Sequence, residues 1–268
     1  MRFKCFSKLC NVIILDPYFA DIHQSRSISR PDHRTKLLLR CQGNIYTIDS
    51  NSRQPKACIL PPLEKLDGLN YPKFEYAKGV FCLWSSCNHT AVICNPSTGE
   101  VRFLPHLSKV GEDLRTYLCY CSIGFDPNKR RHKILMTLYD TANKSTRLGF
   151  HFIGLDESWR EIKSIPYFKP LMMEGVYIDE AVYFFGAFAN SSRINIVEFN
   201  VRTEEIRTIS LWYDKEIRTD IELYFNLVEI EGKLAAIDSR SNGIQIWILR
   251  SPETEEWIDW LDITFKKN

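Results

Sequence analysis

Histidines and cysteines are the side chains of this sequence that could bind a metal. Cys82, Cys87 and His89 lie close enough together to suggest zinc, because thiolate and imidazole are ligands that structural zinc sites use. Their spacing fits no structural-site pattern, however, and a fourth ligand is not evident. The six histidines are scattered along the chain, so we assign none of them a ligand role. We expect no metal site and no cofactor.

Paired acidic residues and a basic run are the other candidates for chemistry. Glu204-Glu205 and Glu255-Glu256 resemble the carboxylate pairs of glycosidases, but both fall in repeated turns, which favours solvated turn charges. The densest basic run, Lys129–Lys133, could touch a nucleic acid, yet it follows Asp126-Pro127 and is interpreted as a hairpin tip. The motifs typical of nucleotide-binding loops, metalloproteases and serine hydrolases are missing. We therefore expect no catalytic residue and no nucleic-acid partner.

Composition indicates a globular protein. The 268 residues are 44% hydrophobic and 13% aromatic, which is enough for one large all-β domain or two small ones. No apolar stretch approaches the roughly 18 residues of a membrane span, so we expect no membrane partner. The nine cysteines include no Cys-x-x-Cys pair, and several lie in apolar runs. This usage predicts reduced core thiols in a cytoplasmic or nuclear protein.

A hairpin signal spans Ala91–Pro105. An apolar run ends at Asn95-Pro96, a polar turn follows, and Val101 and Phe103 then alternate with polar residues. Proline presets φ at the first corner of a turn, and Gly99 can adopt the positive φ that a tight return requires. This stretch therefore predicts two antiparallel strands.

The same pattern returns along the chain. Apolar runs end in Asp, Asn or Ser before a polar turn at six places: Asp49, Asn95, Asp126, Asp156, Asn200 and Ser251. Strand-rich units that recur about every forty residues are typical of a β-propeller, in which stacked sheets bury faces that none could bury alone. We predict an all-β fold, a propeller-like repeat of short antiparallel sheets. A jelly roll or sandwich remains an alternative.

The first residues differ from the rest. Phe3, Phe6, Leu9 and Ile13 recur at helical spacing, and Asp16-Pro17 then interrupts the pattern. We expect three segments: a short helical region over residues 1–24, a polar linker over 25–35, and a β domain over 36–268.

The tryptophans divide into two groups. Trp159, Trp247 and Trp257 lie at strand positions of the repeat and are expected in the core. The positions of Trp84, Trp212 and Tyr213 fit the strand repeat less regularly. Exposed aromatic residues on loops are common binding hot spots. The hypothesis is that these three contribute to a substrate-binding face.

Several motifs together carry a family resemblance. Arg2–Leu9 continuing to Asp16–Phe19 resembles the second half of an F-box. Asn95–Glu100 with Leu104-Pro105 resembles the F-box-associated domain of plant F-box proteins. Further motifs of that domain follow in the family's order: Gly124–Pro127, Trp159-Arg160, Gly175–Ile178, Ile196–Asn200, Glu231–Ala235 and Ile246–Trp257. The resemblance spans nearly the whole chain.

This resemblance implies a non-enzymatic substrate-recognition component of a Skp1–cullin–F-box ubiquitin ligase, with an unknown protein as substrate. The F-box face would comprise Phe3, Phe6, Leu9 and Ile13. The sequence begins at Met1, directly before the part that resembles the second half of an F-box, and two explanations stay open: a start site assigned too late, or a degenerate member of the family. Cys10 stands where the family usually has tryptophan, so docking of this sequence on a Skp1-like adaptor is expected to be weak or lost. Two alternatives remain, an interaction domain without ligase coupling and a propeller enzyme.

Overall fold

The computed structural model divides the chain into two compact units. One comprises residues 1–71 with 96–100, and the other comprises residues 72–95 with 101–268. The structure describes residues 36–41, 44–49, 58–59, 73–85, 90–95, 100–105, 117–152, 159–162, 168–171, 174–188, 194–211, 225–239 and 243–264. The helical region expected over residues 1–24 lies outside these ranges, and the three expected segment boundaries stay predictions. The first unit contains a three-stranded antiparallel sheet of β1 (Lys36–Cys41), β2 (Asn44–Asp49) and β3 (Cys58–Ile59).

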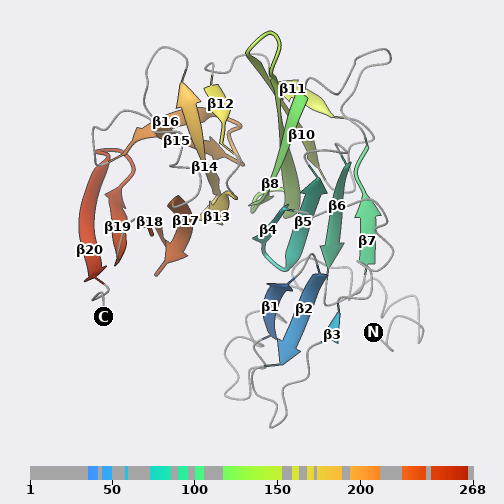
Figure 1. Cartoon of the computed structure of the whole chain (residues 1–268). Coiled ribbons are helices and arrows are strands. Elements are labelled where there is room, and N and C mark those ends of the chain that lie inside the picture. Colours follow the sequence, from blue (N-terminus) through green and yellow to red (C-terminus); the bar gives the residue numbers. More distant parts are fainter. Residues whose placement is uncertain are drawn as a thin grey trace. The chain divides into compact units, whose positions relative to one another are not determined.

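Four antiparallel sheets follow in chain order (Figure 1). Their strands are β4 (Lys73–Ala77), β5 (Val80–Ser85), β6 (Thr90–Asn95) and β7 (Glu100–Phe103); β8 (Tyr117–Asp126), β9 (Arg131–Asp140), β10 (Ser145–Phe152) and β11 (Arg160–Ile162); β12 (Phe168–Pro170), β13 (Val176–Ile178), β14 (Ala181–Phe188), β15 (Ile194–Asn200) and β16 (Ile206–Ser210); and β17 (Phe225–Ile230), β18 (Lys233–Asp238), β19 (Gly243–Ser251) and β20 (Glu256–Thr264). Every described element is a strand, so the predicted all-β class is confirmed. No helix able to cross a membrane occurs in the described ranges.

Two-residue turns connect β4 to β5, β13 to β14 and β17 to β18. They lie at Lys78-Gly79, Asp179-Glu180 and Glu231-Gly232, and both residues of each turn have positive φ. That backbone conformation matches the twist of the flanking strands, which is why such turns favour two-residue hairpins. Gly79 and Gly232 adopt it without steric cost.

Four-residue turns form the second recurring connection. Asp126, Asp140 and Asn200 each end a strand and accept two hydrogen bonds from backbone N–H groups two and three residues later. The fourth turn residue has positive φ in all three cases, at Arg130, Lys144 and Glu204. A side-chain carbonyl or carboxylate that accepts backbone donors explains why Asp and Asn precede these turns. The turn after Asp140 is an additional turn, which the six positions predicted from the sequence do not include.

Apolar cores fill the space between successive sheets. Ile123 and Met136 of the β8–β11 sheet pack with Cys82 and Ile93 of the β4–β7 sheet. Equivalent clusters join β8–β11 to β12–β16 and join β12–β16 to β17–β20. Strands β4, β8 and β13 contact one another, and β13 also contacts β17. This stacking of small sheets is the propeller-like arrangement that the repeat predicts.

Two tryptophans link the outer strands of neighbouring sheets. The indole of Trp159 donates to the carbonyl of Pro105 at 2.6 Å, and that of Trp257 donates to Ser210 at 2.9 Å. Both are half-buried and pack against the adjoining apolar clusters. Trp159, Trp247 and Trp257 were expected in the core, but all three are half-buried; Trp159 and Trp257 pack at the margin of the clusters and add a polar contact between sheets.

Candidate functional site

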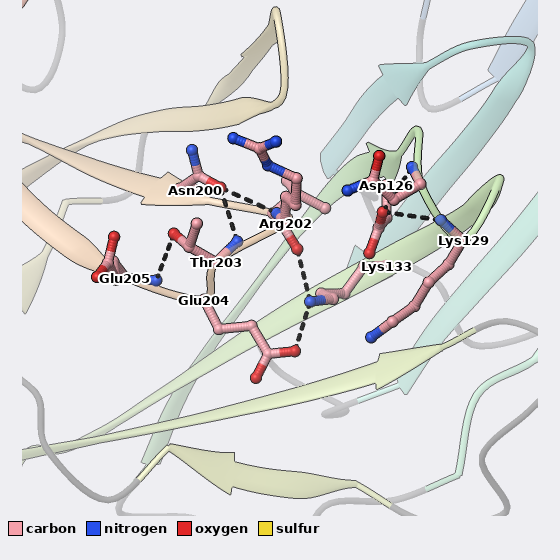
Figure 2. A network of polar contacts seen from close by, with 10 residues as sticks. Asp126, Lys129, Lys133, Asn200, Arg202, Thr203, Glu204 and Glu205 are labelled. Atoms are coloured by element: carbon pink, nitrogen blue, oxygen red, sulfur yellow. Dashed lines mark hydrogen bonds and ion pairs between the residues drawn. The ribbon is translucent and has the colours of Figure 1, made fainter.

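A buried lysine lies where the β8–β11 sheet meets the turn after β15 (Figure 2). The ammonium group of Lys133 donates to the carbonyl of Val201 at 2.6 Å and to Oε1 of Glu204 at 2.7 Å. It also lies 5.9 Å from the ring centroid of Phe199. Lys133 is 1% exposed. Burial lowers the pKa of Lys133, and the contact with Glu204 acts in the opposite direction.

Local turn geometry positions this ion pair. Asn200 accepts hydrogen bonds from the backbone of Arg202 and Thr203 at 3.0 and 2.8 Å, which fixes the turn that carries Glu204 (Figure 2). Lys133 lies opposite Gly124 in the β8–β9 ladder. A Cβ atom at Gly124 would lie 2.4 Å from Cγ2 of Val201, so only glycine permits this close approach of the two sheets.

Glu75 is the second buried charged residue of interest. Its carboxyl accepts hydrogen bonds from the Ser122 hydroxyl at 3.1 Å, from Ile123 N–H at 3.2 Å and from Gly175 N–H at 2.7 Å. It therefore joins β4, β8 and the segment before β13. Burial raises the pKa of Glu75 to about 8, although the hydrogen bonds favour the ionised form; the nearby charge of Glu174 adds to the rise.

Neither buried group has the surroundings of a catalytic residue. The ammonium group of Lys133 is engaged by Glu204 and a backbone carbonyl, the carboxyl of Glu75 accepts three hydrogen bonds, and both side chains are buried. Cys82, Cys119 and Cys121 are free thiols in the core, and burial raises the pKa of Cys121 well above its usual range. Within the described ranges no group of acidic, histidine or cysteine side chains could hold a metal. These buried polar groups fix neighbouring sheets to one another.

The exposed apolar side chains concentrate on β20. Trp260 is 49% exposed, Ile263 41%, Leu261 37% and Ile258 36%. Acidic residues are interspersed among them, and β20 is the last strand of its sheet. This strand is the surface best suited to contact another protein among the residues that the structure describes.

One predicted binding residue is buried. Trp84 lies on β5, is 2% exposed and packs in the cluster between the first two sheets of the second unit. The expectation that Trp84 is an exposed aromatic residue is therefore wrong, because β5 is an inner strand of its sheet and is buried on both faces. Trp212, Tyr213 and the expected adaptor face of Phe3, Phe6, Leu9 and Ile13 lie outside the described residues.

Three important residues were missed by the sequence reasoning. Glu75 lies on β4 and Lys133 on β9, and each is a charged residue at a buried strand position. A charge next to apolar residues within a predicted strand was the signal available in the sequence. Trp260 was not classified, although its spacing from Trp257 departs from the two-residue period of a strand. The three-residue spacing arises because Trp260 is the extra residue of a β-bulge in β20.

The fold and its buried contacts define an all-β, propeller-like scaffold of stacked sheets. Residues 42–266 match the model of the F-box associated beta propeller domain family. The chain belongs to this family, which is a family of protein-interaction modules.

Relatives named as F-box proteins match nearly the whole chain. F-box protein At1g52495 of Arabidopsis thaliana is 26% identical over 96% of this chain, and F-box protein At3g57590 of the same plant is 28% identical over 97%. A third, F-box protein At5g65850, is 27% identical over 95%. The chain spans 63%, 66% and 64% of the lengths of these three relatives.

Proposed function

We propose that this protein is a substrate-recognition component of a Skp1–cullin–F-box ubiquitin ligase. The observation that carries the proposal is the family match over residues 42–266, together with relatives named as F-box proteins. In this role the β domain binds a target protein and raises its effective concentration near the ubiquitin-transferring enzyme. Such a protein needs no catalytic residue of its own.

The described residues support a binding role. Their buried polar groups are used to join sheets, while exposed aromatic and aliphatic side chains gather on an edge strand. We propose that the protein works without a cofactor, in the cytoplasm or nucleus, and a fluorescent fusion would test this location.

Affinity purification tests the proposal. The tagged chain is expressed in plant cells with a proteasome inhibitor, and its partners are identified by mass spectrometry. Recovery of a Skp1-like adaptor together with a ubiquitinated target is the expected result. Recovery of a target without adaptor or cullin would instead favour an interaction domain without ligase coupling.

A direct binding measurement addresses the adaptor alone. Weak docking through residues 1–24 stays a prediction, and a pull-down of purified chain with a Skp1-like protein measures it. Full-strength binding would contradict weak docking but would strengthen the assignment to a ligase.

A further inference from the structure

The edge strand β20 has a free side among the described strands. Of the strands that the structure describes, β19 alone pairs with it, and no described strand pairs with the backbone groups on its other side. Trp260 is nearly half exposed there. Exposing the large apolar ring of a tryptophan to water is unfavourable, and an edge strand can associate with another chain. An exposed tryptophan at a sheet edge is therefore typical of a surface that a partner covers.

A β-bulge determines how a partner can bind. Trp247 pairs with Asp259, whereas its neighbour Ile246 pairs with Leu261, so Trp260 is the extra residue of the bulge. A bulge bends the strand and interrupts the regular spacing of backbone donors and acceptors. A long partner strand therefore cannot pair without interruption along β20, and recognition must depend on side chains.

The charge of the strand selects the chemistry of that partner. Five acidic residues and no lysine or arginine lie between Ser251 and Thr264. Glu256 forms an ion pair with Arg250 at 3.2 Å, and Asp262 accepts a hydrogen bond from Gln245 at 3.1 Å. Asp259 is exposed and has no such contact within the described part of the chain. Among the described residues no lysine or arginine pairs with Asp259 or Asp262, so both carboxylates can accept a cation from outside the chain.

We propose that β20 binds a lysine- or arginine-bearing segment of a protein target, with the cation against Trp260 and with Asp259 and Asp262 as counter-ions. An indole ring is the aromatic group that attracts a cation most strongly, and a neighbouring carboxylate adds a charge-assisted hydrogen bond. The same acidic residues repel the phosphates of nucleic acids and anionic lipids. This inference names the kind of segment recognised and so rests on the proposed function.

Fluorescence anisotropy with the full chain tests the inference. The probe is a fluorescein-labelled peptide in which arginine and valine alternate, and the control peptide has glutamate in place of arginine. We expect the basic peptide to bind, with an affinity that falls as salt is added. Trp260→Ala should weaken binding about two- to fivefold, the usual range for an exposed cation–aromatic contact. Asp259→Asn should weaken it and reduce the salt dependence.

A matched control variant is available on another edge strand. Phe103 lies on β7, is 59% exposed and neighbours Arg102 rather than an acidic residue. Phe103→Ala should leave peptide binding unchanged. Circular dichroism spectra verify that each variant is folded.

Three results would overturn the inference: no binding of the basic peptide, equal binding by Trp260→Ala, or preferential binding of single-stranded RNA. The affinity purification described above separates this failure from failure of the proposed function. Targets and adaptor that Trp260→Ala recovers in the same amount as the wild type would refute a role for β20 and leave the ligase assignment standing. Loss of adaptor and targets from the wild-type chain, with peptide binding intact, would refute the assignment instead.

Discussion

A single buried carboxyl makes the stability of this protein depend on pH. Glu75 has a pKa of about 8 in the folded chain, against 4.5 for an ordinary glutamate. Between these values the folded state retains a proton that the unfolded state has released. The stabilisation is therefore complete below about pH 4.5 and is lost as the pH rises towards 8.

The free energy of unfolding should accordingly fall between pH 5 and pH 8, by up to about 1.4 kcal/mol per pH unit from this group. Urea denaturation at a series of pH values measures it. Glu75→Gln should flatten the profile, although it costs one hydrogen bond because the amide nitrogen cannot accept from Ile123 N–H. Glu229→Gln, at an exposed position on β17, is the control and should keep the slope. An unchanged slope in Glu75→Gln would contradict the assignment.

The Lys133–Glu204 pair should respond unequally to removal of its partners. Glu204→Gln leaves a buried ammonium without its counter-charge, and we expect a loss of about 3 kcal/mol. Lys133→Met replaces the cation by an apolar chain in a site lined by Phe199, while Glu204, whose side chain is 31% exposed, can be solvated. Its cost should be smaller.

Chemical denaturation of both variants tests this order of effects. Glu161→Gln removes a half-exposed partner of Arg147 and should change stability by less than about 1 kcal/mol. Equal losses of stability in Glu204→Gln and Lys133→Met would contradict the expectation that a buried ammonium without its counter-charge is the costlier defect.

At the scale of elements, one glycine determines how closely two sheets approach. A Cβ atom at Gly124 would lie 2.4 Å from Val201 and 3.1 Å from Val182. Gly124→Ala should therefore destabilise the protein by about 1–3 kcal/mol, the usual cost of overpacking. The midpoint of thermal unfolding reports the loss.

A second substitution tests the cause of that loss. Val201→Ala removes the closest methyl group and should be less costly in the Gly124→Ala background than in the wild type, because it relieves the clash. Strict additivity of the two substitutions would exclude a direct clash as the explanation.

At the scale of the whole molecule, shared cores couple the sheets of residues 72–95 and 101–268. Each apolar cluster between successive sheets draws side chains from both, so no sheet keeps its buried face if its neighbour unfolds. We expect these sheets to unfold in one cooperative transition.

Two distant core variants test this coupling. Ile123→Ala and Leu234→Ala lie in different clusters, and both should shift the same transition, monitored by tryptophan fluorescence and by far-ultraviolet circular dichroism. Separate transitions for the two variants would show that the sheets unfold independently.

Local signals in the sequence determined the strands, the turns and the family. Turns at Asp126 and Asn200 were predictable because a side-chain oxygen that accepts nearby backbone donors acts within a few residues. The recurrence of these turns predicted stacked antiparallel sheets, and the order of motifs indicated the F-box-associated family, which the family match confirms.

Only the tertiary structure decided which residues are buried and which are exposed. Trp84 was expected at the surface and lies in the core, whereas Trp260 is exposed at a bulge. Glu75 and Lys133 meet partners 48 and 71 residues away, at Ile123 and Glu204. Burial and such contacts depend on how one sheet packs on the next, and residue type and spacing alone do not specify that packing.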